Sequence, residues 1–592
     1  MTYVLGLSFN YHDSAAALIH DGKVVAAADE ERFSRRKHDH RFPQKAIEFC
    51  LQQAGISSSE LDHVAFYEHS IVKFDRIVRS ALRADSVEQS TGYLGNVVEG
   101  WLHERKFDDL RMIADKLGVP ADRIGANPHH LSHAAVAYFS SPFAKATVVT
   151  MDGVGEYETL AVWLGEGNTL KRLYGLELPE SLGLFYSAFT AFLGFEVNEG
   201  EYKVMGMAGF GTPKHLDTVR SLIQLTDDGL FSIDRRYFEF ESPTDLPYRP
   251  ALIDLLGPAR EPESPFRIGS ADAEPGAGSI EAVSQHYANI AASVQKVTEE
   301  TILHVVRHAV ARTGIHDVCI AGGVGLNSLA NRRIQRELGC ELYVHPAAGD
   351  SGASLGAALN YYHGQLKRPR TGALSNPYLG AAYHDDEILA ALRVHRLSRF
   401  IHCASSDLLV NETVDRLAAG KVVGWMQGRF EWGPRALGNR SILANPTLDT
   451  TKETVNVRIK FREPFRPFAP SVLMEHAHEY FDLPERIDDA APENFMLSVT
   501  DVRPEKRHVI PAVTHVDGTA RVQVVCRETN PLYYDLIEAF GRRTGVPVIL
   551  NTSFNMRGEP MVDKPYDALE TFSWSDMDCL VMGNYVVDKE MV

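Results

Sequence analysis

Three histidines fall within five positions in the stretch HHLSHA, residues 129–134. On a helix, His129 and His133 are four residues apart and share a face, so both imidazoles can reach one transition-metal ion. His130 and His133 are three residues apart and also share a face, so the spacing alone does not select the ligand pair. The competing interpretation is a helix with surface histidines in its first turn. A metal site therefore needs further ligands from elsewhere in the chain.

Two aspartates in glycine-containing turns are candidates for these further ligands. Asp152 lies in TMDGVGE and Asp350 lies in AAGDSGAS, each at the end of a strand or loop. A glycine beside the aspartate lets its carboxylate point into a cleft, and carboxylate oxygens complete many histidine metal sites. Taken alone, each of them is more often a turn residue with a structural role.

A glycine-rich turn in IAGGVGLNSLAN, residues 320–331, stands between a predicted strand and a predicted helix. Such a turn exposes backbone N–H groups that can hold a phosphate. It matches neither the dinucleotide-binding nor the P-loop pattern. Asp350 follows in a second such turn, and two turns of this kind near two aspartate-bearing hairpins are typical of the nucleotide cleft of actin, hexokinase and Hsp70. In NEGEYKVMGMAGFG, Lys203 is equally consistent with a phosphate contact and with an exposed charged loop.

Basic side chains gather in three segments of the last third of the chain. These are GRFEWGPRALGNRSILANP with Arg429, Arg435 and Arg440, VRIKFREPFRPFAPS with Arg458, Lys460, Arg462 and Arg466, and LNTSFNMRGEP with Ser553, Asn555 and Arg557. Arg521 is a further candidate on a predicted strand. A nucleotide polyanion needs guanidinium and ammonium donors, with hydroxyl and amide groups to fix its position. Because the whole chain carries a net charge of −18, this concentration of cations predicts an anion site.

Hydrophobic periodicity predicts the elements that must position these residues. We expect strands at 3–8, 15–20, 23–32 and 64–68, helices at 44–55 and over HHLSHAAVAYFSS, a polar helical stretch at 70–120, two strands within 145–167, one long helix at 279–313, and strand–turn–helix units at 317–339 and 341–364. Segment 226–275 is predicted to be an insertion or loop. A second α/β unit follows, with elements at 407–428 and 546–555. An aspartate-bearing hairpin occurs twice, which indicates an internal architectural repeat.

Bulk composition narrows the class of protein. With 592 residues and 44% hydrophobic residues, the chain can form several domains with their own cores. The net charge of −18 argues against a nucleic-acid partner. The six cysteines are scattered without a C-x-x-C pair, which argues against zinc ribbons and disulfides and favours the reducing cytoplasm. We expect no signal peptide and no membrane association.

Ten motifs in this order resemble the O-carbamoyltransferases of nodulation-factor and antibiotic biosynthesis. They are HDSAAAL, EERFSRRKH, HHLSHA, MDGVGE, GEYKVMGMAGFG, AGGVGLN, GDSGASLGAA, GPRALGNRS, REPFRPFAPS and LNTSFN. The resemblance implies an α/β protein whose first domain, 1–365, is similar to the threonylcarbamoyl-tRNA-modification ATPase-like fold of the actin superfamily. It implies a linker at 366–400 and a YrdC-like domain at 401–592.

The same resemblance implies a two-step reaction. The second domain forms carbamoyl-adenylate from carbamoyl phosphate and ATP, and the first domain transfers the carbamoyl group to a hydroxyl of a small natural product. The implied cofactor is a divalent metal, Fe(II), with Mg²⁺ as a further candidate alongside ATP. Adenylation makes chemical sense, because nitrogen donation makes a carbamate a poor electrophile and AMP is a good leaving group. A bound metal can polarise the carbonyl or hold the phosphate.

The residues that the resemblance assigns fall into three groups. The metal ligands are His129, His133, Asp152 and Asp350, with His129 favoured over His130 by alignment of the H-x-x-x-H motif. The carbamoyl-adenylate and nucleotide contacts are Lys460, Arg466, Ser553 and Asn555, with Arg435 and Arg521 as further contacts and Gly322, Gly323 and Asn327 as the nucleotide turn. His12, Asp13 and Lys37 are acceptor- and carbamoyl-side residues, and His12 or Asp13 is the general base.

Other functions remain open at this point. An actin-superfamily small-molecule kinase explains the first 365 residues and leaves the basic cluster without a role. A tRNA-modification-type carbamoyl or threonylcarbamoyl transferase is disfavoured by the acidic net charge. A hydrogenase-maturation protein has similar domains, but it would carry C-x-x-C pairs and the reverse domain order. A non-catalytic sensor would not need both residue sets. The size permits a homodimer, and the sequence does not identify the acceptor.

Overall fold

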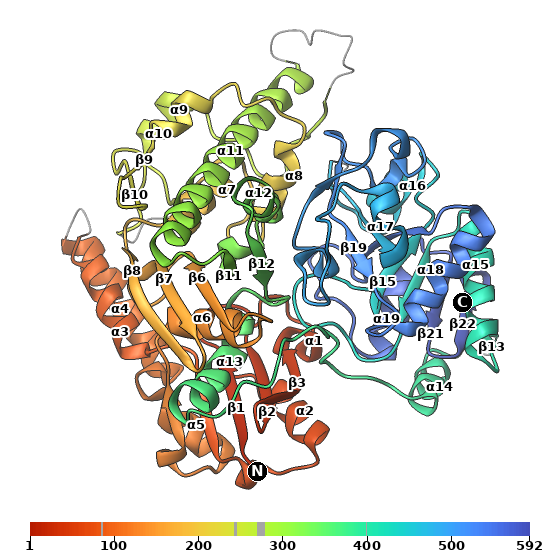
Figure 1. Ribbon diagram of the computed structural model, residues 1–592, viewed down its shortest axis with the longest axis horizontal. Coiled ribbons are helices and arrows are strands. Elements are labelled where there is room, and N and C mark those ends of the chain that lie inside the picture. Colours follow the sequence, from red (N-terminus) through yellow and green to blue (C-terminus); the bar gives the residue numbers. More distant parts are fainter. Residues whose placement is uncertain (84–86, 242–245, 269–278, 398, 464, 592) are drawn as a thin grey trace. The chain divides into compact units, whose positions relative to one another are not determined.

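The protein is described by a computed structural model (Figure 1). The structure describes residues 1–83, 87–241, 246–268, 279–397, 399–463 and 465–591. Contacts divide the chain into two compact units. Unit 1 comprises Met1–Asn10, Leu18–Lys23 and Ile56–Gly372, and unit 2 comprises Tyr11–Ala17, Val24–Gly55 and Ala373–Val592. Both are mixed α/β structures, as predicted; the predicted domain boundaries stay a prediction.

Two five-stranded sheets have the same strand order. The first runs β3 (Lys23–Asp29), β2 (Ala15–His20), β1 (Tyr3–Ser8), β4 (His63–Phe66) and β5 (Ile124–Ala126). The second runs β8 (Thr169–Glu177), β7 (Glu158–Glu166), β6 (Lys145–Met151), β11 (Asp317–Ala321) and β12 (Glu341–Val344). In each sheet the first strand of the hairpin pairs in parallel with the next strand outward, β1 with β4 and β6 with β11. The predicted internal repeat is confirmed.

Two helices of unit 1 carry three of the four candidate metal ligands and pack closely against each other. α6 (His129–Phe139) contacts β6, β7 and β11, while α13 (Asp350–Leu359) contacts β1 and β4. Each helix is therefore anchored to a different sheet. Their close approach depends on small residues, because a Cβ at Gly356 would overlap the carbonyl oxygen of Ser132.

The remaining helices of unit 1 follow most of the sequence predictions. The polar stretch at 70–120 forms α3 (Ser70–Ala81), α4 (Val87–His103) and α5 (Asp109–Leu117). α11 (Ile280–Thr313) begins where the Ser279 hydroxyl accepts a hydrogen bond from the Ala282 N–H, and it ends at Gly314, whose φ is +69°. Three further helices pack against α11: α7 (Leu182–Phe192), α8 (Glu201–Ala208) and α12 (Ser328–Leu338).

Segment 226–275 was predicted as a loop, and this is only partly right. Within its described part lie β10 (Phe231–Ile233), which pairs with β9 (Ile223–Leu225), and α10 (Pro250–Leu256). Proline at the first position of α10 starts this helix rather than breaking it. Residues 242–245 and 269–275 of this segment lie outside the described residues.

Unit 2 is built on an eight-stranded mixed sheet. Its order is β13 (Ile401–His402), β22 (Tyr585–Asp588), β21 (Cys579–Met582), β14 (Val423–Met426), β15 (Arg440–Ala444), β20 (Val548–Ser553), β16 (Ala469–Leu473) and β19 (Gln523–Val525). Trp425 belongs to a core with α15 (Ser406–Ala418) and α18 (Pro531–Thr544). Its neighbour Met426 belongs to a second core with α14 (Asp385–Val394) and α19 (Pro565–Trp574). Successive side chains of a strand point to opposite faces, so both faces of the sheet are covered.

The elements predicted at 407–428 and 546–555 are present, and the helix α14 lies within the predicted linker segment 366–400.

Among the described residues, none of the helices combines the length and the apolar character that a membrane span requires.

Close packing between α6 and α13 gives a first prediction. Gly356→Ala should lower the melting temperature of the full chain by several degrees, because the added methyl meets backbone that cannot rotate away, and overpacking costs about 1–3 kcal/mol. Gly100→Ala, in the helix α4 with open space around its Cα, is the control and should be neutral or slightly stabilising. Equal melting temperatures for the two variants would contradict this packing.

Candidate metal centre and anion-binding site

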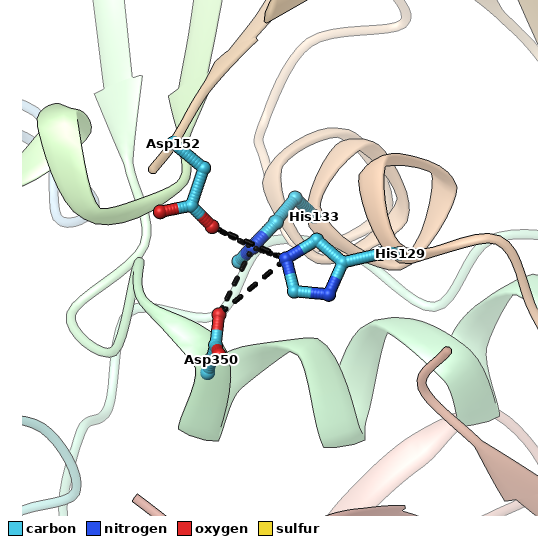
Figure 2. Close-up of side chains that lie close together, drawn as sticks. All are labelled: His129, His133, Asp152 and Asp350. Carbon is cyan, nitrogen blue, oxygen red and sulfur yellow. Dashed lines mark hydrogen bonds and ion pairs between the residues drawn. The ribbon is translucent and has the colours of Figure 1, made fainter. Parts of the chain in front are cut away.

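Four side chains of unit 1 converge on one point, as Figure 2 shows. They are His129 and His133 from α6, Asp152 after β6, and Asp350 at the start of α13. Asp152 Oδ2 is 3.2 Å from His129 Nε2 and 2.9 Å from His133 Nε2. Asp350 Oδ1 is 3.6 Å and 3.3 Å from the same two nitrogens. The four predicted ligands are thus brought together from segments far apart in the sequence.

The donor set fits a transition-metal ion. Ligands at about 2.1 Å from a tetrahedral ion stand about 3.4 Å from one another, close to the measured separations. The two nitrogens are themselves 3.1 Å apart. Imidazole and carboxylate together suit iron, zinc or manganese, so the ligand types do not select one metal.

Backbone contacts fix Asp152 so that one carboxylate oxygen faces the cluster. Its Oδ1 accepts hydrogen bonds from the N–H groups of Gly153, at 2.8 Å, and Gly323, at 3.2 Å. Its Oδ2 is left for the two histidines. At Gly322, whose φ is +91°, the turn lies directly against the backbone of Met151. A Cβ at this position would overlap the carbonyl oxygen of Met151.

The predicted nucleotide turn has contacts of its own. The Gly322 N–H donates to the Ala348 carbonyl, and the Gly323 N–H donates to Asp152. The Asn327 side chain caps α12 by accepting a hydrogen bond from the Ala330 N–H. In this structure the turn therefore supports Asp152 and starts a helix.

His130 faces away from the cluster. Its Nδ1 lies 2.8 Å from the Thr150 hydroxyl, and the side chain is fully buried. Burial, together with the neighbouring His129 and His133, lowers the pKa of His130 to about 3, so it is neutral at physiological pH. This geometry resolves the ambiguity of the HHLSHA spacing in favour of His129 and His133.

The cluster has the electrostatics of a cation site. Burial works against protonation of His133, but hydrogen bonds and charge from Asp152 and Asp350 raise its pKa to about 9. The pKa of His129 is raised against burial by Asp350 and Asp152. Burial opposes ionisation of Asp152, yet the two imidazoles hold its pKa well below the usual range. The half-buried Asp152 and the buried Asp350 thus attract positive charge, which protons or a metal ion can supply.

A second site, in unit 2, assembles around Lys460. The ammonium group donates to Ser553 Oγ at 3.0 Å and to Asn555 Oδ1 at 2.6 Å, and also to the carbonyl oxygens of both residues. Burial, followed by the charges of Arg462 and Arg466, lowers the pKa of Lys460 well below its usual value. The structure therefore brings together three of the predicted anion contacts.

Arg521 adds to this concentration of positive charge. Burial, followed by the charges of Arg435, Arg462 and Arg466, lowers its pKa well below the usual value. Its Nε has no hydrogen-bond partner among the described residues. Lys37 lies near enough to Lys460 that its positive charge helps to lower the pKa of Lys460. A cluster of cations of this kind favours a multiply charged anion.

Two other arginines of the predicted basic cluster have structural roles, which corrects the sequence interpretation. The Arg440 guanidinium is fully buried and donates to carbonyl oxygens that include those of Gln427 and Ala381. Arg429 donates to the carbonyl oxygens of Gly380 and Val25. Both guanidinium groups thus hold backbone segments of unit 2 together. Lys203 lies buried on α8, not in an exposed loop.

Two of the predicted acceptor-side residues, His12 and Asp13, belong to a chain of hydrogen bonds in unit 2. Asp13 Oδ2 is 2.8 Å from His12 Nδ1, and Asp13 Oδ1 is 2.7 Å from His38 Nδ1. The Glu31 carboxylate accepts the His38 N–H at 2.9 Å. Burial opposes ionisation of Asp13, but the two imidazoles lower its pKa below the usual range. Asp13 and His38 both have positive φ, 52° each, a conformation that surrounding contacts must maintain.

Sequence reasoning missed His38, Glu31 and Glu68 as site neighbours. His38 follows Lys37 directly in EERFSRRKH, so the motif contained the signal. Glu68, at 2% exposure, lies next to His129. Its only signal in the sequence was its place as a carboxylate at the end of the strand predicted at 64–68.

Comparison with known proteins decides the family. A model described as the carbamoyltransferase N-terminus matches residues 3–359, and one described as the carbamoyltransferase C-terminus matches residues 414–589. The chain belongs to the carbamoyltransferase family. It is 37% identical to the nodulation protein NolNO of Sinorhizobium fredii, over 98% of this chain and 79% of that protein. It is 40% identical to protein sll1178 of Synechocystis, over 100% of this chain and 97% of that one.

Among solved structures, HypF of T. kodakarensis overlaps 62% of this chain and 48% of its own, with 13% identity and a TM-score of 0.32. A likeness this low carries no argument about function. The family models and the nodulation relatives are sufficient to establish that the chain is an enzyme of the carbamoyltransferase type.

The raised pKa of His133 gives a pH prediction for this carbamoyltransferase. A histidine whose folded pKa is about 9, above the ordinary 6.5, stabilises the fold fully below pH 6.5 and loses that contribution as the pH rises through 9. After chelator treatment, the melting temperature should therefore fall by several degrees between pH 6.5 and 9.

His133→Gln should flatten this pH dependence. His130→Gln, in the same helix, is the matched control and should keep it, because His130 is neutral throughout the range. A slope that is unchanged in His133→Gln would show that His133 does not hold this proton.

Proposed function

We propose that this carbamoyltransferase uses ATP and carbamoyl phosphate to make carbamoyl-adenylate at the Lys460 site, and then transfers the carbamoyl group to a hydroxyl of a small natural product. The carrying observation is the cluster of the buried Lys460, the half-buried Arg521 and their arginine neighbours Arg462 and Arg466, which lie close enough to influence one another's pKa. Such a cluster suits ATP and carbamoyl phosphate, which bring many negative charges to one place.

The activation step balances with one water molecule. Water cleaves carbamoyl phosphate into carbamate and inorganic phosphate. A carbamate oxygen then attacks the α-phosphorus of ATP, a C–O–P anhydride forms, and pyrophosphate leaves. Lys460 and Arg521 would stabilise the negative charge that builds on the phosphoryl oxygens, as pre-positioned cations do in phosphoryl transfer. Ser553 and Asn555 hold the Lys460 ammonium in place.

In the transfer step, the acceptor hydroxyl attacks the carbamoyl carbon and AMP leaves with the electron pair of the broken C–O bond. The hydroxyl proton needs a base. Asp13 is a poor candidate, because two imidazoles occupy both of its oxygens and lower its pKa. His12 is the better one, because Asp13 holds its Nδ1 and thereby orients an imidazole, the side chain that most often serves as a general base.

The four-residue cluster of unit 1 would hold the divalent metal, with Fe(II) as the proposed ion. Bound there by His129, His133, Asp152 and Asp350, the ion would supply Lewis-acid charge for a phosphate or carbonyl oxygen. Asp152 owes its orientation to the Gly153 and Gly323 amides, so these amides help to shape the site.

The repeated strand order supports an actin-superfamily fold for the N-terminal part of the chain. In that fold, two similar sheets with the same order arise from duplication of one motif. We propose a YrdC-like fold for residues 401–592, where the mixed sheet presents Ser553 at the end of β20 beside Lys460.

The activation step is tested by carbamoyl-phosphate-dependent exchange of labelled pyrophosphate into ATP. Lys460→Met should lower this exchange at least about 100-fold, the usual effect of removing a charge-stabilising donor. The exposed Lys171→Met is the control and should exchange normally. A wild-type enzyme that phosphorylates an acceptor without releasing pyrophosphate would instead be a kinase.

The assignment of His12 predicts that the two steps separate. His12→Gln should keep pyrophosphate exchange and lose carbamoyl transfer by roughly 100-fold or more, because general-base catalysis contributes about that much. Transfer is measured by mass spectrometry as the gain of one carbamoyl group on hydroxylated natural products. If exchange and transfer fell together in His12→Gln, His12 would not act as the base of the transfer step.

A further inference from the structure

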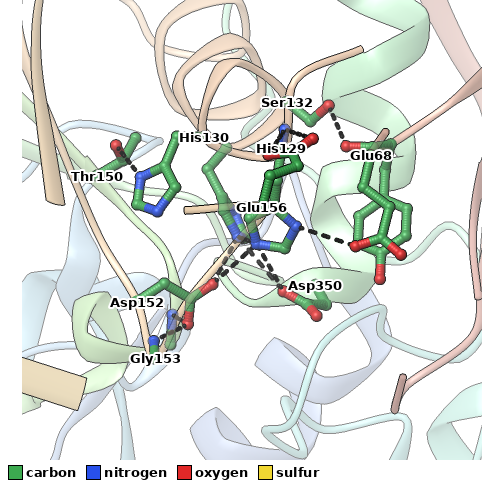
Figure 3. A network of polar contacts seen from close by, with 12 residues as sticks. Glu68, His129, His130, Ser132, Thr150, Asp152, Gly153, Glu156 and Asp350 are labelled. Atoms are coloured by element: carbon green, nitrogen blue, oxygen red, sulfur yellow. Dashed lines mark hydrogen bonds and ion pairs between the residues drawn. The ribbon is translucent and has the colours of Figure 1, made fainter. Parts of the chain in front are cut away.

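We propose that Glu68 is a positioning residue for the metal centre: it accepts the Nδ1 proton of His129 and thereby fixes this imidazole for metal binding. The inference rests on the metal centre of the proposed function. Figure 3 shows Glu68 on the far side of the His129 ring from Asp152 and Asp350. Glu68 lies two residues beyond the end of β4, whose last residue is Phe66.

The first observation is the orientation of the His129 ring. Its Nε2 faces His133, Asp152 and Asp350, so Nε2 is the atom that would bind a metal. A neutral imidazole carries one proton, which must then lie on Nδ1. That Nδ1 is buried and has no hydrogen-bond partner among the described residues. A buried donor without an acceptor costs about 1–3 kcal/mol.

The second observation is the carboxylate that faces this donor. Glu68 Oε2 is 3.9 Å from His129 Nδ1, and the two side chains are 2% and 3% exposed. A direct hydrogen bond needs the two atoms to approach by about 1 Å. Among the described residues, the other metal histidine, His133, has no carboxylate within ion-pair distance of its Nδ1. Glu68 is therefore specific to His129.

The third observation is how Glu68 itself is held. The Lys73 ammonium, from the first turn of α3, donates to both of its oxygens at 2.9 and 3.0 Å. This contact keeps a buried carboxylate in one orientation and balances its charge. The ring of Tyr67 packs against the His129 ring, with centroids 5.3 Å apart. A carboxylate behind a metal-bound histidine fixes its tautomer and strengthens it as a ligand.

Cobalt(II) binding to the metal-stripped full-length chain tests the inference. We expect Glu68→Gln to bind Co²⁺ about 10–100-fold more weakly than wild type, with a changed visible absorption spectrum and an unchanged circular dichroism spectrum. Glu68→Asp, which keeps the charge, should retain an affinity between the two. Lys73→Met should weaken binding less than Glu68→Gln, because the carboxylate remains.

Glu156→Gln is the matched control, because Glu156 is a nearby buried carboxylate that accepts from the backbone N–H of His129 and not from its ring. It should change Co²⁺ affinity less than about three-fold, below the range expected for a carboxylate behind the ring. Equal affinities of wild type and Glu68→Gln would overturn the role of Glu68 and leave the metal centre in place. A wild-type chain that binds no Co²⁺ would overturn the metal centre and this inference together.

Discussion

Two carboxylates, the half-buried Asp152 and the buried Asp350, meet two buried imidazoles in unit 1, and this concentration of negative charge is the constraint on which the site depends. A carboxylate is costly to bury unless a cation or several donors balance it. Asp152 is balanced on one oxygen by two backbone amides, and its other oxygen needs a positive partner. The two carboxylates also raise the pKa values of His129 and His133, in opposition to the effect of burial.

The architecture of unit 1 serves to bring these four groups together. α6 and α13 are anchored to different sheets, and their close packing at Gly356 places the first turn of each helix at one point. The Glu156 carboxylate accepts the N–H groups of His129 and His69, which fixes where α6 begins. Unit 2 presents a different chemistry, since several cationic side chains lie close to Lys460 and Arg521.

Much of this arrangement could be predicted from the sequence, because periodicity and motif order are local signals. The long helix at 279–313 and the repeated hairpin were predictable for that reason. Helical spacing alone did not select the ligand pair, because His129 and His130 both have helical spacing to His133. The family resemblance favoured His129, and the contact of His130 with Thr150 agrees with that choice. The same limit applies to Arg429 and Arg440: composition showed the charge, but their carbonyl partners come from distant segments.

The account depends most directly on a metal ion held by His129, His133, Asp152 and Asp350. Anomalous diffraction at the iron absorption edge shows whether an iron ion is bound there. The crystals would be grown from the full chain with Fe(II) in the absence of oxygen. The account predicts one strong anomalous peak within bonding distance of all four side chains. An active enzyme whose crystals show no anomalous density among these four residues would contradict it.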